Sequence, residues 1–405
     1  MTLHQSFVRR AIRSDAGFTV LELMVATAIM MAVTGAVFSF MNPAQGAFKA
    51  QPEMSDMQQR LRVGVDAIQK DLLMAGAGSY VGSGAGALYN FFAPILPYRS
   101  GDVDPDQAKD VFYRPDAISV LYVPPTPAQT TIADTMPQTS AELKVTPQIN
   151  CDESKKDKLC GFSQGMQVIV FDPSGSWDTM EITEVQPEAT PPHLQHNRDR
   201  LSTQYDVGAN ITQIAMHTYY YNSTDLQLMH YDGANTDLPV IDNVVKVQFE
   251  YFGEPEPPRL LPTAVLSSPV GPWTTYGPRP PVLGKPSNTS YGDGANCTFQ
   301  VVDGVQVPRL ESLSAGGVGQ VPLPPEIFQD GPWCPDESRA SRFDADLLRI
   351  RRVRVNLRLQ VGLPTLRGPA GLLWSNGGTS QSGYHMIPDQ EIHFDVTPRN
   401  MNLGR

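Results

Sequence analysis

The chain has 405 residues, with 31 Lys and Arg against 42 Asp and Glu, which gives a formal net charge of −11. This balance argues against nucleic acid as a partner, because phosphate contacts need clustered basic side chains. About 330 residues, 76–405, follow the N-terminal region described next, which is enough for one large domain or two small ones.

The N-terminal region combines a basic leader with a long apolar run. Residues 1–17 contain Arg9, Arg10 and Arg13 against a single acidic residue, and residues 18–41 hold one charge, Glu22. An apolar run of this length predicts a helix that crosses a bilayer once. Positive charge before the span is expected to hold that end in the cytoplasm and to send the remainder of the chain across the membrane.

The helix is expected to continue over residues 42–75, where the pattern becomes amphipathic. Apolar side chains then recur every three or four residues, at Met54, Met57, Leu61, Val65, Ile68 and Leu72. Such a stripe predicts a helix face that packs on a globular domain. Pro43 and Pro52 are expected to loosen the helix locally, and Gly76 and Gly78 to end it through a left-handed cap.

The remainder of the chain, 76–405, reads as a domain rich in strands. Strand signals lie, in chain order, at residues 117–123, 166–171, 180–185, 211–221, 226–231 and 245–251. The fourth and fifth of these segments flank a polar turn, which predicts a β-hairpin. In the last segment apolar and polar residues alternate, which indicates a half-exposed strand.

Residues 253–335 differ from the rest because they hold 16 of the 36 prolines, and they predict a long, mostly irregular excursion. A strongly alternating strand follows at 353–361, with a slip of phase near Arg351–Arg352 that predicts a bulge or a helix-to-strand change. The last strand contains Ile392, Phe394 and Val396. A long helix followed by antiparallel strands predicts an α+β fold, with the helix packed on one sheet face.

The four cysteines suggest two disulfides in an exported chain. Three pairings are possible, and Cys151–Cys160 with Cys297–Cys334 is favoured because each pair closes a local polar loop. A structural zinc site is the rival interpretation, but the Cys-x-x-Cys spacing typical of such sites does not occur.

The sequence gives little support to an enzyme or to a resident cofactor. It lacks the Gly-x-Ser-x-Gly elbow, the Gly-x-x-x-x-Gly-Lys phosphate loop and the Gly-x-Gly-x-x-Gly fingerprint. His193 and His196 follow two prolines and lack the helical spacing of a zinc protease, so a solvated loop is expected there rather than a metal site.

A cluster of aspartates is a weak candidate for a calcium site. Asp102, Asp104, Asp106 and Asp110 follow the ligand spacing of an EF-hand loop. The glycine and the final glutamate of that loop are both missing, so an acidic surface turn is the favoured interpretation.

The order Gly17, Phe18, three residues, Glu22 and an apolar helix resembles the class III signal of type IV prepilins and type II secretion pseudopilins. The resemblance implies cleavage after Gly17 by a prepilin peptidase and N-methylation of Phe18. It also implies that Glu22 pairs with the N-terminal amine of a neighbouring subunit, since a carboxylate in a bilayer helix costs about 2.5 kcal/mol or more and normally has a partner. The alternative is an ordinary signal anchor in which Glu22 is incidental.

Residues 71–76, 218–252, 348–355 and 399–400 are similar to the PilW family of minor pilins. This resemblance implies a type IV pilin-like fold and a subunit that joins other minor pilins and the major pilin at the inner-membrane assembly platform. Such a subunit helps to start the filament and caps its tip at the cell surface. J-type minor pseudopilins of type II secretion share this architecture and are the alternative.

A tip adhesin is a third possibility, with the proline-rich excursion as its contact surface. The excursion carries four aromatic residues that would either contact a surface or anchor the loop internally: Trp273, Tyr276, Tyr291 and Trp333.

Overall fold

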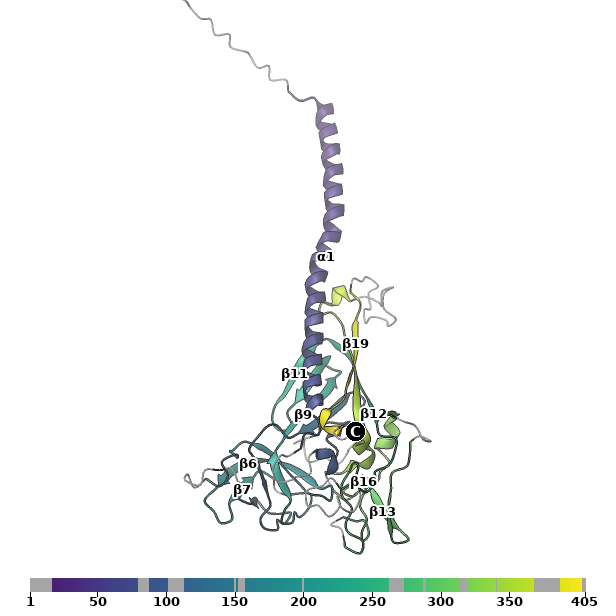
Figure 1. Cartoon of the computed structure of the whole chain (residues 1–405). Helices are drawn as coiled ribbons and strands as arrows, with labels where there is room; N and C mark the ends of the chain where they lie inside the picture. Colours follow the sequence, from purple (N-terminus) through teal and green to yellow (C-terminus); the bar gives the residue numbers. More distant parts are fainter. Residues whose placement is uncertain are drawn as a thin grey trace, which may run out of the picture. The chain divides into compact units, whose positions relative to one another are not determined.

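The computed structural model contains one long helix, α1 (Val20–Met74), and a set of antiparallel sheets (Figure 1). It describes residues 17–78, 87–100, 113–148, 151, 157–198, 200–261, 273–286, 289–313, 319–339, 341–367 and 387–402, without the side chains of 40–49 and 365. The chain separates into two compact units, residues 1–55 and 56–405. The predicted α+β class agrees with this content of helix and antiparallel strands.

The first sheet of the large unit has five antiparallel strands in the order β1-β2-β9-β10-β11. Their bounds are β1 (Ile95–Leu96), β2 (Ala117–Tyr122), β9 (Ala215–Asn222), β10 (Gln227–Tyr231) and β11 (Asp237–Asp242). β9 and β10 form the hairpin that the polar turn predicted.

The second sheet has four strands in the order β15-β12-β18-β19. Their bounds are β15 (Val321–Leu323), β12 (Val244–Gly253), β18 (Ile350–Leu359) and β19 (Gln390–Val396). The pairing of β12 with β18 shifts between Phe252 and Gly253, opposite Arg352 and Ile350. A 3-10 turn, η4 (Ala345–Arg349), directly precedes β18. The predicted slip of phase near Arg351–Arg352 is therefore confirmed, with both a bulge and a helix-to-strand change.

The part of α1 that belongs to the large unit contacts both of these sheets, not one sheet face as predicted. Met57, Leu61, Ile68 and Leu72 are buried and Val65 is half-buried, whereas Met54 is 38% exposed, so the predicted stripe is confirmed from Met57 onward and is wrong at Met54. A Cβ placed on Gly64 would lie 2.8 Å from Ile241 Cδ1 in β11 and 3.5 Å from Leu357 Cδ2 in β18. The absence of a side chain at residue 64 thus leaves room for Ile241 of β11 and Leu357 of β18 beside the helix.

The helix ends where the sequence predicted. Gly76 has φ of +75°, a left-handed conformation that glycine adopts without strain. Its N–H donates to the carbonyl oxygen of Leu121 at 3.0 Å, which ties the end of the helix to strand β2.

The third sheet has six strands in the order β3-β8-β5-β6-β7-β4 and its own apolar core. Its strands are β3 (Gln129–Thr131), β8 (Asn210–Gln213), β5 (Gln167–Phe171), β6 (Trp177–Gln186), β7 (His193–His196) and β4 (Glu142–Lys144). The prediction of a single strand at 211–221 is wrong. The segment forms two strands, because the chain leaves this sheet at Ile214 and enters the five-stranded sheet as β9.

The proline-rich excursion is more ordered than predicted in its described parts. It contains the hairpin β13 (Phe299–Val302) and β14 (Val305–Pro308), the edge strand β15, and β16 (Trp333–Cys334), which pairs with β17 (Phe343–Asp344). The described residues also form the 3-10 turns η1 (Leu88–Asn90), η3 (Pro325–Phe328), η5 (Pro364–Leu366) and η6 (Arg399–Met401).

Two disulfides join the cysteines in the favoured pairing. Cys151 and Cys160 have Cα atoms 5.6 Å apart, and Cys297 and Cys334 have Cα atoms 5.1 Å apart. The second bond closes 37 residues of the excursion, which limits how far this segment can open in the unfolded chain.

The buried stripe of α1 predicts a large effect of truncation at Ile68, whose side chain is fully buried. Ile68→Ala is expected to lower the free energy of unfolding by about 2–5 kcal/mol, through lost apolar burial and a residual cavity. Val63, on the same helix but 48% exposed, is the matched control, and Val63→Ala should change the value by less than about 0.5 kcal/mol. Urea unfolding of the full chain in detergent measures both, and equal losses would contradict the packing of this face.

Candidate functional site

Residues 20–39 of α1 are long and apolar enough to cross a membrane, a property that membrane anchors share with signal sequences. Twenty residues at 1.5 Å each span about 30 Å, the thickness of a bilayer hydrocarbon core. None of this segment is buried against the rest of the chain, and Phe18, just before the helix, is 90% exposed. Residues 1–16 of the expected leader lie outside the described residues.

Glu22 takes part in a reciprocal cap at the start of α1. Its Oε2 accepts hydrogen bonds from the backbone N–H and the hydroxyl of Thr19, both at 2.9 Å. The N–H of Glu22 donates to Thr19 Oγ1 at 3.2 Å. This is a capping box, Thr-x-x-Glu, which satisfies two amide groups of the first turn. Thr19, three residues before Glu22, is the sequence signal for this cap, which the assembly role predicted for Glu22 did not include.

The cap uses only one carboxylate oxygen of Glu22. Both hydrogen bonds go to Oε2, and Oε1 has no hydrogen-bond partner among residues 17–78 or the other described segments. The charged group is therefore held in place at the helix N-terminus while one oxygen stays available to a partner.

A second polar group, Asp71, lies on the buried face of α1 in the large unit. Its carboxylate accepts from Tyr219 Oη at 2.6 Å and from Tyr122 Oη at 3.3 Å. His217 Nδ1 lies 3.6 Å from Asp71 Oδ2, and 2.7 Å from His230 Nε2. The sequence indicated Asp71 only as part of the segment 71–76 and predicted no buried polar role for it, although it follows Ile68 by three residues and so shares the phase of the apolar stripe.

The two phenols act as hydrogen-bond donors to Asp71. Burial raises the pKa of both Tyr219 and Tyr122, and the neighbouring charge of Asp71 raises it further. Both hydroxyls therefore stay protonated at neutral pH. The group Asp71, His217 and His230 brings three potential metal-ligand atoms within 4.8 Å of one another.

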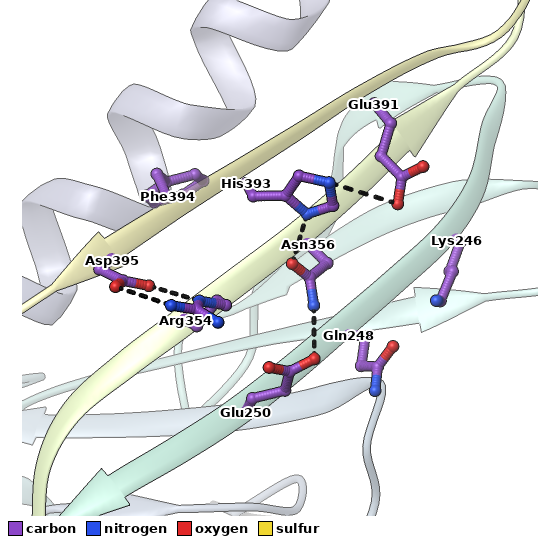
Figure 2. A pocket seen from close by; sticks show the side chains of 9 residues that line it. All are labelled: Lys246, Gln248, Glu250, Arg354, Asn356, Glu391, His393, Phe394 and Asp395. Carbon is purple, nitrogen blue, oxygen red and sulfur yellow. Dashed lines mark hydrogen bonds and ion pairs between the residues drawn. The ribbon is translucent and has the colours of Figure 1, made fainter. Parts of the chain in front are cut away.

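A third polar region is a groove of about 700 Å³ on the outer face of β12, β18 and β19 (Figure 2). His393 Nδ1 lies 2.6 Å from Asn356 Oδ1, whose amide nitrogen donates to Glu250 Oε1 at 2.9 Å. Arg354 donates two hydrogen bonds to Asp395, and these lower the pKa of the Asp395 carboxyl. These groups satisfy one another across three strands, which is the behaviour of a solvated sheet face.

The histidines of β7 do not form a site. The segment predicted as a solvated loop is a strand, with Leu194 and His196 buried. His193 Nδ1 lies 3.4 Å from Glu142 Oε2, whereas His196 Nδ1 accepts from the N–H of Arg198. Residues three apart in a strand face opposite sides of the sheet, so these two rings cannot bind one ion.

The aromatic residues of the proline-rich excursion divide into buried and partly exposed ones. Trp273 and Tyr276 are buried, which favours internal anchoring over surface contact. Tyr291 and Trp333 are partly exposed and bonded to each other, through the Tyr291 hydroxyl and the Trp333 carbonyl at 2.8 Å. Asp102, Asp104, Asp106 and Asp110 lie outside the described residues.

No protein-family model, curated protein or solved structure matches this chain. The observations define a class: a strand-rich domain with two disulfides, preceded by an exposed apolar helix whose first turn carries a capped glutamate.

Proposed function

We propose that this chain is a minor pilin that helps to initiate type IV pilus assembly and lies at the filament tip. One observation carries the proposal: the first turn of an exposed apolar helix presents Glu22, five residues after Gly17, with one carboxylate oxygen uncommitted. The helix then continues to Met74, where its last turns pack on the strand-rich domain. Prepilin peptidase would cut after Gly17 and methylate the new amine of Phe18.

Stem packing is the physical basis of the proposed assembly. The apolar side chains of residues 20–39 would be covered first by the inner membrane and then by neighbouring stems, with helix axes about 8–10 Å apart. In that bundle Glu22 would face the amine of a neighbouring subunit, since opposite buried charges reduce the cost of removing each from water. The partners are other minor pilins and the major pilin, brought together at the inner-membrane assembly platform.

The size of the domain favours a terminal position. At about 350 residues its radius of gyration should be roughly 20 Å, from the compact-chain scaling. Stems 8–10 Å apart cannot each carry such a domain along a shaft without crowding, whereas a tip complex leaves space around it. The two disulfides fit an oxidising compartment, which agrees with a domain in the periplasm and later at the cell surface.

Processing gives the first test. In cells that contain prepilin peptidase, the mature chain is expected to begin at Phe18 and to carry one added methyl group, because the signal precedes the apolar helix. Mass analysis of the N-terminal peptide from membrane-extracted protein measures this. A Gly17→Leu variant provides the uncleaved reference. A mature chain that keeps residues 1–17 would contradict the proposal and favour a signal anchor.

Glu22 can be tested without disturbing its cap. Glu22→Gln is expected to reduce incorporation into filaments about tenfold or more while leaving the domain folded, because glutamine retains the capping box but loses the charge. Thr19→Ala is the matched variant, since it weakens the cap and keeps the charge, and it should assemble nearly normally. Quantitative blotting of sheared filaments compares the two. Equal incorporation of Glu22→Gln and wild type would rule out the charge pairing.

Location is tested by imaging. A small tag inserted between Asp303 and Gly304, in the exposed turn of the β13–β14 hairpin, should label one end of each filament, and deletion should reduce filament number more than filament length. Label spaced along the whole shaft would contradict a tip position. Tagged protein recovered only with pseudopilins of a secretion system would assign the chain to that filament instead.

A further inference from the structure

We propose that Asp71, His217 and His230 form a binding site for a zinc-type divalent transition metal ion. The site would join the end of α1 to strands β9 and β10 within the large unit. The inference rests on the geometry of this cluster and does not depend on the role proposed for the chain in filament assembly.

The three ligand atoms already lie close together. Nδ1 of His217, Nε2 of His230 and a carboxylate oxygen of Asp71 all lie within 4.8 Å of one another. The two ring nitrogens are 2.7 Å apart, and His217 Nδ1 lies 3.6 Å from Asp71 Oδ2. Tetrahedral zinc, with bonds of about 2.0–2.1 Å, needs ligand atoms about 3.3 Å apart. Small rotations of the two rings would therefore open the nitrogens to this spacing.

The histidine pair has the electronic arrangement that a cation requires. Two imidazole nitrogens at 2.7 Å share a single proton, so one donates and the other accepts. Without that proton, both lone pairs point into the same space beside the carboxylate. A divalent cation in that space would take the place of the shared proton and would also neutralise Asp71, a buried charge that is costly without a counter-charge.

The surrounding hydrogen bonds fit a metal-bound state. A ligating histidine usually donates its second ring N–H to a neighbouring group, which fixes its orientation. Nε2 of His217 lies 3.2 Å from Tyr122 Oη, which in turn lies 3.3 Å from Asp71 Oδ1. The relay therefore runs from His217 Nε2–H to the Tyr122 oxygen, and from the Tyr122 hydroxyl to Asp71. Tyr219 fixes the other carboxylate oxygen at 2.6 Å.

The donor set selects the class of metal. Two imidazoles and one carboxylate are typical of zinc and of other late first-row ions, whereas magnesium and calcium prefer oxygen ligands throughout. Three protein ligands leave a fourth position for water. The side chain of His217 is 24% exposed, which provides a route for the ion from solvent. A bound ion would link residue 71 of the helix to residues 217 and 230 of the sheet.

The experiment uses the full chain in detergent, treated with a chelator that is then removed. Titration with Co²⁺ should produce visible absorption of a low-symmetry site at one ion per chain, and Zn²⁺ should displace it. Zinc at a free concentration one hundred times its dissociation constant should raise the unfolding temperature by about 4 °C.

Variants locate the ion. His230→Gln should weaken Co²⁺ affinity at least about a hundredfold, because loss of even a second-layer partner commonly costs 10–100-fold. Tyr122→Phe keeps all three ligands and removes the hydrogen-bond relay, so it should weaken Co²⁺ affinity about tenfold. It is the deciding variant if His230→Gln does not fold. His393→Gln removes a histidine that is 60% exposed elsewhere and is the control expected to bind as wild type.

The proposal would be overturned by absence of Co²⁺ absorption in the wild-type chain together with no shift in unfolding temperature. It would also be overturned if a folded His230→Gln, or Tyr122→Phe where that variant decides, bound Co²⁺ as tightly as His393→Gln. Either result would identify the cluster as a proton-sharing histidine pair only. Neither result would alter the tests of processing or filament location, which concern Gly17, Glu22 and an exposed hairpin.

Discussion

The close contact of one helix with two sheets is the constraint on which the large unit depends. Residues 57–72 of α1 bury a single face, and Gly64 allows that face to approach β11 and β18 together. The helix therefore covers one face of each sheet near β11 and β18. The end of the helix is fixed as well, because the N–H of Gly76 donates to the Leu121 carbonyl in β2. Loss of this packing would expose apolar surface on three elements at once.

The spacing of apolar residues predicted those helices and strands that have one side in the core and the other in solvent. The alternation in 245–251 became β12, with Val247, Phe249 and Tyr251 buried. The slip before Val353 became a real bulge, because the phase of apolar residues records which side faces the core. The apolar stripe of α1 could be predicted for the same reason. These features are local, so the sequence expresses them directly.

Sheet membership and buried polar groups depended on contacts distant in sequence. The run at 211–221 is evenly rich in strand-forming residues, and nothing local shows that Ile214 ends one sheet and Ala215 begins another. Arg349 and Arg351 are fully buried, the first bonded to the carbonyls of Glu254 and Pro255 and the second stacked near Tyr89 and Tyr276. Charged residues are expected in solvent unless a partner is known. The ion-pair partner of Arg349, Asp346, is only three residues away, whereas the ring of Tyr89 beside Arg351 is 262 residues away.

Glu22 caps the first turn of α1, but this cap does not supply a positive charge to balance its carboxylate. The capping box accounts for two amide groups of the first turn, and the positive end of the helix dipole favours a carboxylate there. A glutamine would cap almost as well, so the cap alone does not explain a full negative charge among apolar residues. In water that charge is solvated at little cost. In a bilayer or a bundle of stems it needs a cation, and an amine beside Oε1 would supply one without displacing Thr19. In the proposed filament, the cap would then position the carboxylate, and the subunit that provides the amine would determine where the chain is incorporated.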